Sequence, residues 1–473
     1  MPVAQVAVCH EPQLRYTGQP PFDPPNPVYE AVCTLLRALG LDAAHGGTAA
    51  WNPFGGMVRP GGRVVIKPNL VTSRDFHRDL NDDELSCSST HASVLRPLLD
   101  LAVRAVGPSG SVAVLDCPLE GSDFDRTARA LGVTDMIGAL ERSLGRPIPL
   151  LDLREFRLGR KMIIDDLRVG GRSFNFGLLY PIALSGDPLG SAVVDLGTDS
   201  VFTDYAAPAR RLRFHRSHKR TPVRHHRNGR NEYSIANSAL AADLVINVPK
   251  MKTHKKAGAT LSMKSVIGLS PKKYWLPHYT AGAPPRGDEY AESPPLAARI
   301  AEQLSRFPLP GGCSAVVRAP KLTARGEGNM GGSWSRNDTI WRTVVDLNRI
   351  LLYADRAGAL QPTPQRRVFT VVDGIVAGEG EGPLAASPKH CGVLIGGENL
   401  VAVDTVACEV MGIDPLAIRY LSGAEHLARF ALTNGERIER IRVGETMPRF
   451  SFQLPQGWDE PGAAIAERAV ARG

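Results

Sequence analysis

A short apolar run stopped by a proline is the feature that most limits how this chain can fold. Residues 243–248 read Asp-Leu-Val-Ile-Asn-Val, and an apolar run of this length is typical of a buried β-strand. Pro249 ends the strand because it has no N–H to donate to a sheet ladder. The basic segment 250–278 follows at once, so we expect it to start at the end of a buried strand.

Lysine is concentrated in that segment. The chain has 12 Lys and 44 Arg, and seven of the 12 lysines lie between residues 250 and 278. A desolvated ammonium group can lose its proton, whereas a guanidinium group cannot, so the switch from Arg to Lys predicts lysine chemistry. We expect functional roles for the basic residues nearest the strand end: Lys250, Lys252, His254 and Lys264. A solvated basic face is the better expectation for the others: Lys255, Lys256, Lys272 and Lys273.

The rest of the chain alternates strands with helices. A strand at 63–71 that breaks at Pro68, a helix at 91–106 capped by Thr90 and a strand at 111–116 form a βαβ unit. Further helices are predicted at 28–40, 341–353 and 401–411, and further strands at 367–373 and 393–395. The pattern predicts an α/β fold with a mainly parallel sheet flanked by helices.

Changes in composition divide the chain. We expect a first α/β part of the core at 1–150, a β-rich insertion at 151–235 and a second α/β part at 236–440. The second part carries the Lys/His block, a glycine-rich loop at 374–383 and a loop-rich insertion at 280–338 with one helix near 296–304. Residues 441–473 are expected to be a peripheral C-terminal tail.

Several predicted strands end in polar residues. Lys67 and Asn69 follow one strand, Asp116 ends the next, Lys250 follows the run at 243–248, and Asp373 ends another. Any one of them could belong to an ordinary turn. Because the carboxyl ends of parallel strands share one edge of a sheet, where ligands bind, we expect these groups to converge on one cleft.

A histidine-rich stretch, HHRNGRNEY, occupies residues 225–233. Its guanidinium groups suit a carboxylate or phosphate, and its imidazoles could act as acid, base or metal ligand. An exposed polar loop remains the alternative, and no HEXXH spacing supports zinc. We expect substrate contacts from this stretch and from the end of the basic segment: His225, His226, Arg227, Arg230 and His278.

Acidic residues form a third group. Asp373, Glu379 and Asp404 offer oxygen ligands of the kind that Mg²⁺ or Mn²⁺ prefers. Asp404 also lies near a predicted helix start, so a helix cap is an equal alternative for it. The glycines at 374–383 could cradle an anion, but GEGEGP does not have the spacing of a phosphate-binding P-loop.

Composition excludes several classes of protein. The net charge of +8 and pI of about 9.2 favour anionic partners, but no basic tail or nucleic-acid motif is present, so a small anion is expected rather than nucleic acid. The seven cysteines are scattered without a CxxC pair, so no iron–sulfur motif is present. Reduced thiols and the lack of a signal peptide or long apolar run predict a cytoplasmic protein with no membrane span.

Nine segments together resemble a known family. They are VVIKPNLV (64–71), STH (89–91), HHxxGRxEY (225–233), ADLVINVPKMKTHKKAGATLSMKSVIGL (242–269), WLPH (275–278), GDEY (287–290), WRTVVDLNRILLYAD (341–355), VVDGIVAGEGEGPL (371–384) and VAVDTVACEVMG (401–412). In this order they resemble the DUF362 family, most closely its larger bacterial branch that lacks an iron–sulfur module. Two positions depart from that branch: Tyr279 stands where a second histidine is frequent, and Ser265 stands where asparagine is frequent.

The resemblance implies little chemistry, because the family name records an unknown function. Some relatives have a redox label from appended cysteine-rich ferredoxin segments, and this chain has none, so that label is not transferred.

The residues themselves predict a cytoplasmic enzyme of biosynthesis that acts on an anionic small molecule, a carboxylate or a phosphate. Lys67, Arg227, Arg230 and Lys250 would hold the anion. Lys252 or Lys264 would transfer a proton with His254 as partner, and Asp373 and Asp404 would bind a divalent cation or orient the lysines. Three other classes stay open: a redox protein that uses a metal or iron–sulfur cluster, a nucleic-acid binder, and a non-catalytic anion-binding protein.

Overall fold

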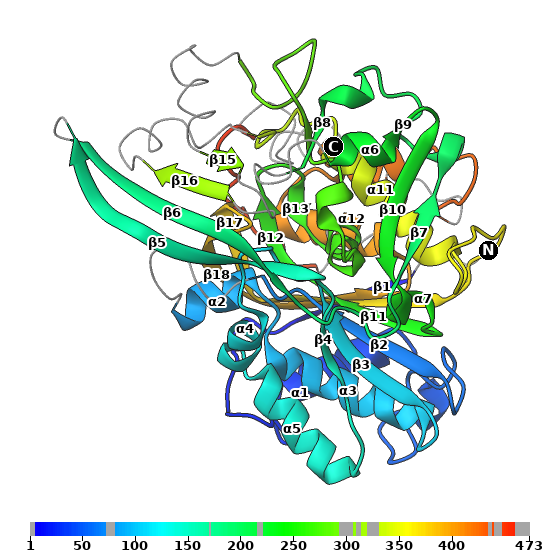
Figure 1. Cartoon of the computed structure of the whole chain (residues 1–473). Helices are drawn as coiled ribbons and strands as arrows, with labels where there is room; N and C mark the ends of the chain where they lie inside the picture. Colours follow the sequence, from blue (N-terminus) through cyan, green and yellow to red (C-terminus); the bar gives the residue numbers. More distant parts are fainter. Residues whose placement is uncertain are drawn as a thin grey trace, which may run out of the picture.

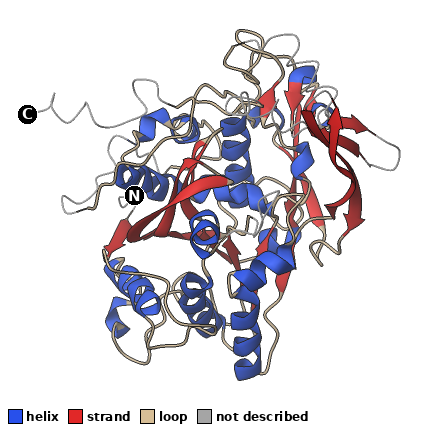
Figure 2. Ribbon diagram, turned by 90° about the vertical axis from the view of Figure 1, so that its left-hand side faces the viewer, coloured by secondary structure: helices blue, strands red, loops and turns tan. Residues whose placement is uncertain are grey.

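A nine-stranded mixed sheet forms the centre of the computed structural model, with helices above and below it (Figures 1 and 2). The structure describes residues 5–71, 81–169, 172–214, 221–292, 306–308, 314–318, 331–433, 438 and 447–458. The strands of this sheet are β1 (Val6–His10), β2 (Arg63–Pro68), β3 (Ser111–Asp116), β4 (Leu150–Asp152), β11 (Leu244–Val248), β12 (Lys250–His254), β13 (Gly258–Thr260), β17 (Arg367–Glu381) and β18 (Ala385–Gly397).

The strand order β1-β18-β17-β11-β2-β3-β4 is parallel from β17 to β4, and β12 also pairs with β17 in parallel. The antiparallel pairings are those of β1 with β18, β17 with β18 and β12 with β13. The predicted α/β fold with a mainly parallel sheet is therefore confirmed. The first and second α/β parts of the chain contribute strands to the same sheet.

Two hydrophobic cores cover the two faces of the sheet. In β11, Ile246 belongs to the core beneath α1 (Pro27–Ala38) and α3 (Ala92–Val106), whereas Val245 belongs to the core beneath α11 (Ile340–Tyr353) and α12 (Leu400–Met411). Successive side chains of a strand point to opposite faces, so a run that is apolar at nearly every position fits burial on both sides.

Further helices surround this framework. They are α2 (Asp82–Ser88), α4 (Phe124–Ala130), α5 (Val133–Leu144), α6 (Pro222–His225), α7 (Asn237–Leu240), α8 (Ser262–Ser265) and α13 (Arg419–Ala424). The helix predicted near 296–304 lies outside the described residues.

Strands of the predicted insertion at 151–235 lie in three small sheets, two of which also contain strands from residues 279–318. The long hairpin of β5 (Phe156–Val169) and β6 (Arg172–Ala183) projects from the body of the protein in Figure 1 and pairs with β16 (Ser314–Arg318) and β15 (Arg306–Pro308). The second sheet contains β7 (Ser191–Asp195), β10 (Arg230–Ala236) and β9 (His226–Arg227), and the third contains β8 (Leu212–Arg213) and β14 (Tyr279–Thr280).

The tail packs onto the body over its described part. The N–H of Phe450 donates to the carbonyl of Val410 at 2.8 Å, and the side chains of Phe452 and Trp458 are buried in the core.

The predicted loop at 374–383 is wrong over most of its length, because β17 continues as a strand to Glu381 and forms a hairpin with β18. Its glycines permit close packing of β12. A Cβ at Gly378 would lie 2.9 Å from the Cβ of Lys252, and one at Gly382 would lie 2.1 Å from the carbonyl oxygen of Thr253. The glycines therefore make room for a neighbouring strand.

The helix at 92–106 is capped by a different residue from the one predicted. Nδ1 of His91 accepts from the N–H of Ser93 at 3.2 Å, so His91 is the N-cap of α3. The hydroxyl of Thr90 donates to the carbonyl of Val248 at 2.7 Å and accepts from the N–H of Asn69 at 2.8 Å. Thr90 thus joins the start of α3 to the carboxyl ends of β2 and β11.

Candidate functional site

The carboxyl ends of β2 and β3 meet in a buried ion pair. Nζ of Lys67 lies 3.0 Å from Oδ1 of Asp116 and also donates to the hydroxyl of Ser265 at 3.1 Å. A Cβ on Gly268 would lie 2.3 Å from Oδ1 of Asp116, so only glycine fits against the pair. Burial lowers the pKa of Lys67, and the nearby carboxylate of Asp116 opposes that shift.

A second buried ion pair joins β12 to β17. Nζ of Lys250 lies 2.8 Å from Oδ2 of Asp373, and both side chains have no exposed surface. The hydroxyl of Tyr16 donates to Oδ1 of Asp373 at 2.5 Å, and the N–H of His91 donates to Oδ2 at 3.1 Å. Protein donors therefore occupy both oxygens of Asp373, and Lys250 has its charge partner within the protein.

Lys252 lies on the same face of β12 as Lys250, two residues along the strand. It has no carboxylate partner within the described part of the chain. Its Nζ donates to the carbonyl of Ser88 and, at 3.4 Å, to that of Pro383. Burial is the main cause that lowers the pKa of Lys252 to about 7, and the charge of Lys250 adds to it.

Lys264 lies on α8. No described residue hydrogen bonds to its Nζ or forms an ion pair with it. Burial, followed by repulsion from other lysines with Lys273 first, lowers the pKa of Lys264 to about 7. An ammonium group held without a partner among like charges is a ready site for an anion.

Two histidines share this environment. Burial lowers the pKa of His254 and of His278 well below the usual value of 6.5. Lys264 lowers the pKa of both rings further, and His278 also lowers that of His254, so these groups lie within electrostatic range of one another. Both rings are therefore neutral at pH 7.

We name these six residues the lysine–histidine cluster: Lys67, Lys250, Lys252, His254, Lys264 and His278. Two buried carboxylates, Asp116 and Asp373, each pair with one of its four lysines. The structure thus brings together the strand ends that the sequence predicted to converge, and it leaves the charges of Lys252 and Lys264 uncompensated by carboxylates of the described residues. The positive potential of such a group attracts anions.

The four lysines expected on a solvated face divide into two pairs. Lys255 and Lys272 form ion pairs with Glu381 at 2.6 Å and Glu155 at 3.4 Å. Lys256 and Lys273 instead hydrogen bond to backbone carbonyls. Lys256 donates to the carbonyl of Gly331, and Lys273 donates to that of Cys117. Lys273 and Lys256 both lower the pKa of Lys264, so they add to the positive charge around the cluster.

Asp404 positions the short helix that carries Lys264. Its two oxygens accept the N–H groups of Ser262 at 2.7 Å and Met263 at 2.9 Å, at the start of α8. Its own helix, α12, is capped by Asn399. Burial raises the pKa of Asp404 to about 7. The cap considered for Asp404 thus exists, but on a different helix from the one expected.

The predicted metal ligands do not gather. Glu379 forms an ion pair with Lys389 at 2.8 Å and accepts the N–H of Gln453 at 2.9 Å. Over the described ranges, no group of three or more His, Cys, Asp or Glu side chains is placed to hold a metal ion.

Asn69 lies just beyond the end of β2. Its amide nitrogen Nδ2 is buried and has no hydrogen-bond partner among the residues that the structure describes. A buried donor without a hydrogen-bond partner is costly. Nδ2 of Asn69 is therefore available to donate to an oxygen atom of a ligand.

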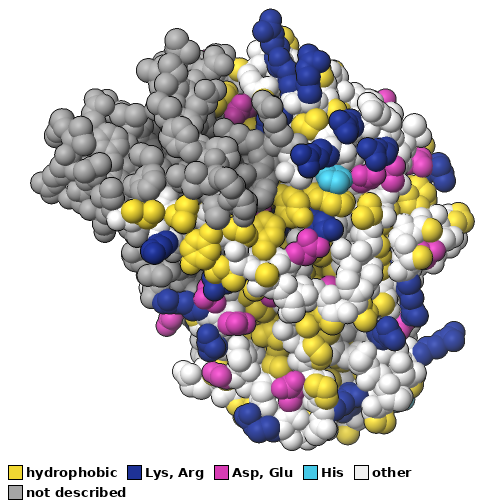
Figure 3. Space-filling view, viewed as in Figure 1, with side chains coloured by type: hydrophobic (Ala, Val, Ile, Leu, Met, Phe, Trp, Pro, Cys, Tyr) yellow, Lys and Arg dark blue, Asp and Glu magenta, His cyan; other side chains and the backbone are white. Residues whose placement is uncertain are grey.

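The histidine-rich stretch borders a pocket of its own. It borders a pocket of about 230 Å³ whose wall includes Tyr205, His226, Arg227 and Arg230 and none of the cluster lysines. Basic side chains gather at the top of the face in Figure 3, over the region of β8, α6 and β9 in Figure 1. His225 forms an ion pair with Glu232 at 3.0 Å and stacks on Trp275 at 3.5 Å between ring centroids.

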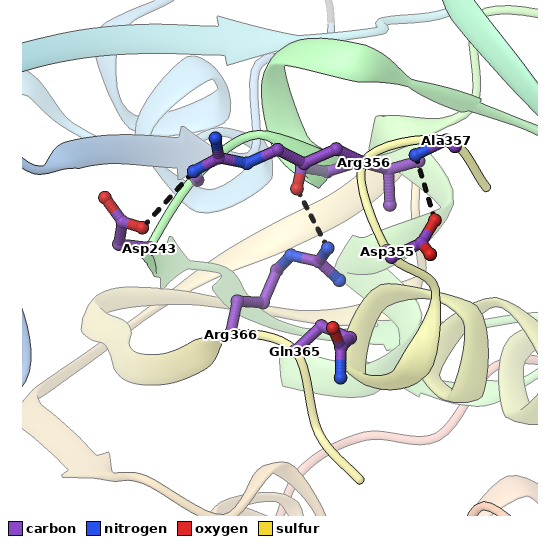
Figure 4. A pocket seen from close by; sticks show the side chains of 8 residues that line it. Asp243, Asp355, Arg356, Ala357, Gln365 and Arg366 are labelled. Atoms are coloured by element: carbon purple, nitrogen blue, oxygen red, sulfur yellow. Dashed lines mark hydrogen bonds and ion pairs between the residues drawn. The ribbon is translucent and has the colours of Figure 1, made fainter. Parts of the chain in front are cut away.

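A larger pocket, of about 380 Å³, lies at the opposite edge of the sheet (Figure 4). Its lining includes Asp243 and Arg366, which directly precede β11 and β17. Arg356 forms an ion pair with Asp243 at 3.6 Å, and Arg366 donates to the carbonyls of Leu240 and Ala354. These charged groups already have protein partners, so the pocket is a weaker candidate than the cluster.

Sequence reasoning missed Tyr16 and His91 as parts of this region. Their rings stack at 4.1 Å between centroids, and both residues hydrogen bond to Asp373. Tyr16 comes from an irregular segment before α1, and no local pattern marks it. The STH motif at 89–91 gave a signal for His91, but only through the family resemblance.

Comparison with known proteins agrees with the sequence motifs. Residues 184–409 match the family described as a domain of unknown function, DUF362. Residues 184–409 of this chain are therefore similar to DUF362 proteins. The match is shorter than the resemblance over roughly residues 60 to 415. The DUF362 domain supplies five members of the cluster, and Lys67 lies outside it, as do Tyr16, His91 and Asp116.

A thylakoid-associated protein of Synechocystis sp. is 23% identical over 420 residues, which are 85% of this chain and 84% of the relative. A crystal structure of a Thermotoga maritima protein aligns with 77% of this chain at 11% identity and a TM-score of 0.32. The alignment spans 54% of that protein, about half its length. Within the described ranges, no helix is both long and apolar enough to cross a bilayer.

Proposed function

We propose that this protein is an enzyme that binds a small carboxylate or phosphate at the lysine–histidine cluster and transfers a proton with Lys252 or Lys264. The observation that carries the proposal is that neither the buried Lys252 nor the half-buried Lys264 has a carboxylate partner among the described residues. An anion placed between them would relieve their repulsion and would accept hydrogen bonds from both.

The acid–base part rests on the pKa values. An amine with a pKa of about 7 exists in both protonation states at neutral pH, which suits a group that gives and takes a proton. The neutral rings of His254 and His278 supply further groups that can exchange a proton. Lys67 and Lys250, which were expected to hold the anion, are held in ion pairs and would act on it through their field.

The proposal assigns no step to a metal ion. Asp373 is bonded to Lys250 and Tyr16, and Glu379 is bonded to Lys389. We assign Asp404 to the positioning of Lys264. Arg227 and Arg230 border a separate pocket, so we do not place them against the same anion.

Inorganic phosphate is a direct probe of the anion site. Isothermal titration calorimetry and thermal unfolding should show that phosphate binds and stabilises the wild-type protein. The variants Lys264→Met and Lys252→Met should each lose most of that binding. Lys255→Met is the matched control, because Lys255 is paired with Glu381 outside the cluster, and it should bind phosphate as the wild type does. Undiminished binding by both cluster variants would refute the site.

Proton transfer needs a separate test. The rate at which a small acetylating reagent modifies each lysine can be followed by mass spectrometry against pH. The profiles of Lys252 and Lys264 should have midpoints near pH 7, below the ordinary lysine value of about 10. Midpoints near 10 for both cluster lysines, with phosphate binding intact, would favour a non-catalytic anion-binding protein.

We also propose that the protein works in the cytoplasm. The described cysteines are free, as expected in a reducing compartment. The name of the thylakoid-associated relative suggests a membrane surface as the other location. Fractionation of cells should recover the protein in the supernatant, and recovery with washed membranes would contradict the proposal.

A further inference from the structure

The two histidines of the cluster are held in opposite tautomers. Nδ1 of His254 faces the backbone N–H groups of Lys256 at 3.1 Å and Ala257 at 3.3 Å. Backbone amides only donate, so this Nδ1 must be the acceptor. The neutral ring of His254 therefore carries its proton on Nε2.

His278 has the reverse arrangement. Its Nδ1 lies 3.0 Å from the carbonyl oxygen of Leu276. A carbonyl only accepts, so Nδ1 of His278 carries the proton and Nε2 has the free lone pair. Protonation of Nε2 is opposed by burial and by the charges of Lys256 and Lys264, which hold the pKa of this ring well below 6.5.

Three groups of the cluster are thus left for a ligand. No residue in the described part of the chain hydrogen bonds to Nε2 of His254, to Nε2 of His278 or to Nζ of Lys264. The first and third of these are donors, and the second is an acceptor. Nζ of Lys256, two residues after His254, lies 5.1 Å from the ring centroid of Tyr279, which follows His278, and the charge of Lys264 acts on both histidine rings.

We propose that the site selects oxyanions that keep a proton, such as hydrogenphosphate or a protonated phosphate monoester, over fully deprotonated oxyanions such as sulfate. The P–OH group would donate to Nε2 of His278, while the charged oxygens would accept from Lys264 and from Nε2–H of His254. Sulfate would place an oxygen against the lone pair of His278 and leave that acceptor unsatisfied. This inference rests on the anion site proposed above.

Phosphate and sulfate at about pH 7 and equal ionic strength test this selection, because phosphate then keeps at least one proton whereas sulfate keeps none. Calorimetric titration of the wild-type protein should show phosphate binding at least about tenfold more tightly than sulfate. His278→Gln should reduce that ratio severalfold, because the amide can turn its NH₂ group toward sulfate. His254→Gln is the matched control. This variant should bind both anions more weakly and keep the ratio of the two affinities, because the NH₂ group of glutamine replaces the Nε2–H donor of His254.

Equal affinity of the wild-type protein for the two anions would overturn the selection and leave the anion site standing. Binding of neither anion would instead refute the proposed function itself. An unchanged ratio of phosphate affinity to sulfate affinity in a folded His278→Gln variant would show that His278 does not contribute to the selection.

An independent readout does not depend on the variants. Nitrogen chemical shifts of ¹⁵N-histidine-labelled protein should show an Nε2–H tautomer for His254 and an Nδ1–H tautomer for His278. The same Nε2–H tautomer in both rings would overturn the inference, since no acceptor would then face the ligand.

Discussion

Nζ of Lys250 lies 2.8 Å from Oδ2 of Asp373, and neither side chain has any exposed surface. Two charges buried together need further hydrogen bonds to offset their loss of water. Here Tyr16 supplies them, because its hydroxyl accepts from Lys250 at 2.8 Å and donates to Asp373 at 2.5 Å. The pair joins β12 to β17 at the edge where the cluster begins.

Asp373→Asn should be strongly destabilising, because it leaves the ammonium group of Lys250 buried without a counter-charge. We expect the free energy of unfolding in urea to fall by about 3–5 kcal/mol. The free energy of unfolding of the double variant Asp373→Asn with Lys250→Met should fall by less than that of Asp373→Asn alone, because no unpaired charge remains buried. Glu379→Gln, which breaks a partly exposed pair with Lys389, is the control and should cost about 1 kcal/mol or less.

The depressed pKa of Lys264 predicts a pH dependence of stability. The pKa of this lysine is about 7 in the folded protein against 10.5 for an ordinary lysine, so the unfolded chain binds the proton more tightly. The charge of Lys264 destabilises the fold fully below about pH 7, and this penalty is removed as the pH rises toward 10.5.

The measurement is the difference in free energy of unfolding between wild type and Lys264→Met without added anion. Between about pH 7 and 10.5, the free energy of unfolding of the wild type should rise relative to that of the variant by at most about 1.4 kcal/mol per pH unit. This rise should be absent in saturating phosphate. A difference that is constant with pH would mean that the pKa of Lys264 is not depressed.

Asp404→Asn tests the positioning of Lys264. Asparagine offers one carbonyl oxygen, whereas Asp404 accepts the N–H groups of both Ser262 and Met263. We expect a loss of about 1–3 kcal/mol in the free energy of unfolding and severalfold weaker phosphate binding. Asn399→Ala removes the cap of α12 itself and should cost about 1 kcal/mol with phosphate affinity unchanged. Equal effects of both variants on phosphate binding would argue against a specific role for Asp404.

Gly268→Ala tests the close packing around the ion pair of Lys67 and Asp116. The added Cβ would lie 2.3 Å from Oδ1 of Asp116 and 2.6 Å from Nζ of Lys67, so one of these groups must move. Overpacking of this kind costs about 1–3 kcal/mol, which urea unfolding would measure. Gly138→Ala is the control, because its nearest neighbour is the end of the flexible Arg142 side chain at 3.5 Å, and it should be neutral or slightly stabilising.

Much of the framework could be predicted because its signals are local. The run predicted as a strand at 243–248 became β11 at 244–248, and the helices predicted at 341–353 and 401–411 became α11 and α12 within one residue. The stretch after Asp373 was predicted as a loop because glycine is rare in strands. Only its pairing with β12 and β18 shows that the glycines make room for neighbours.

The sequence by itself determined the sheet, its helices and the concentration of lysines after β11, because periodicity and composition depend on neighbours along the chain. The tertiary structure decided which of those lysines have counter-charges. Lys67 and Lys250 are paired by Asp116 and Asp373, which lie 49 and 123 residues away in the sequence, and Lys252 and Lys264 are not. Whether an ammonium group is neutralised depends on distances across the fold and on burial, and neither is written in the local sequence.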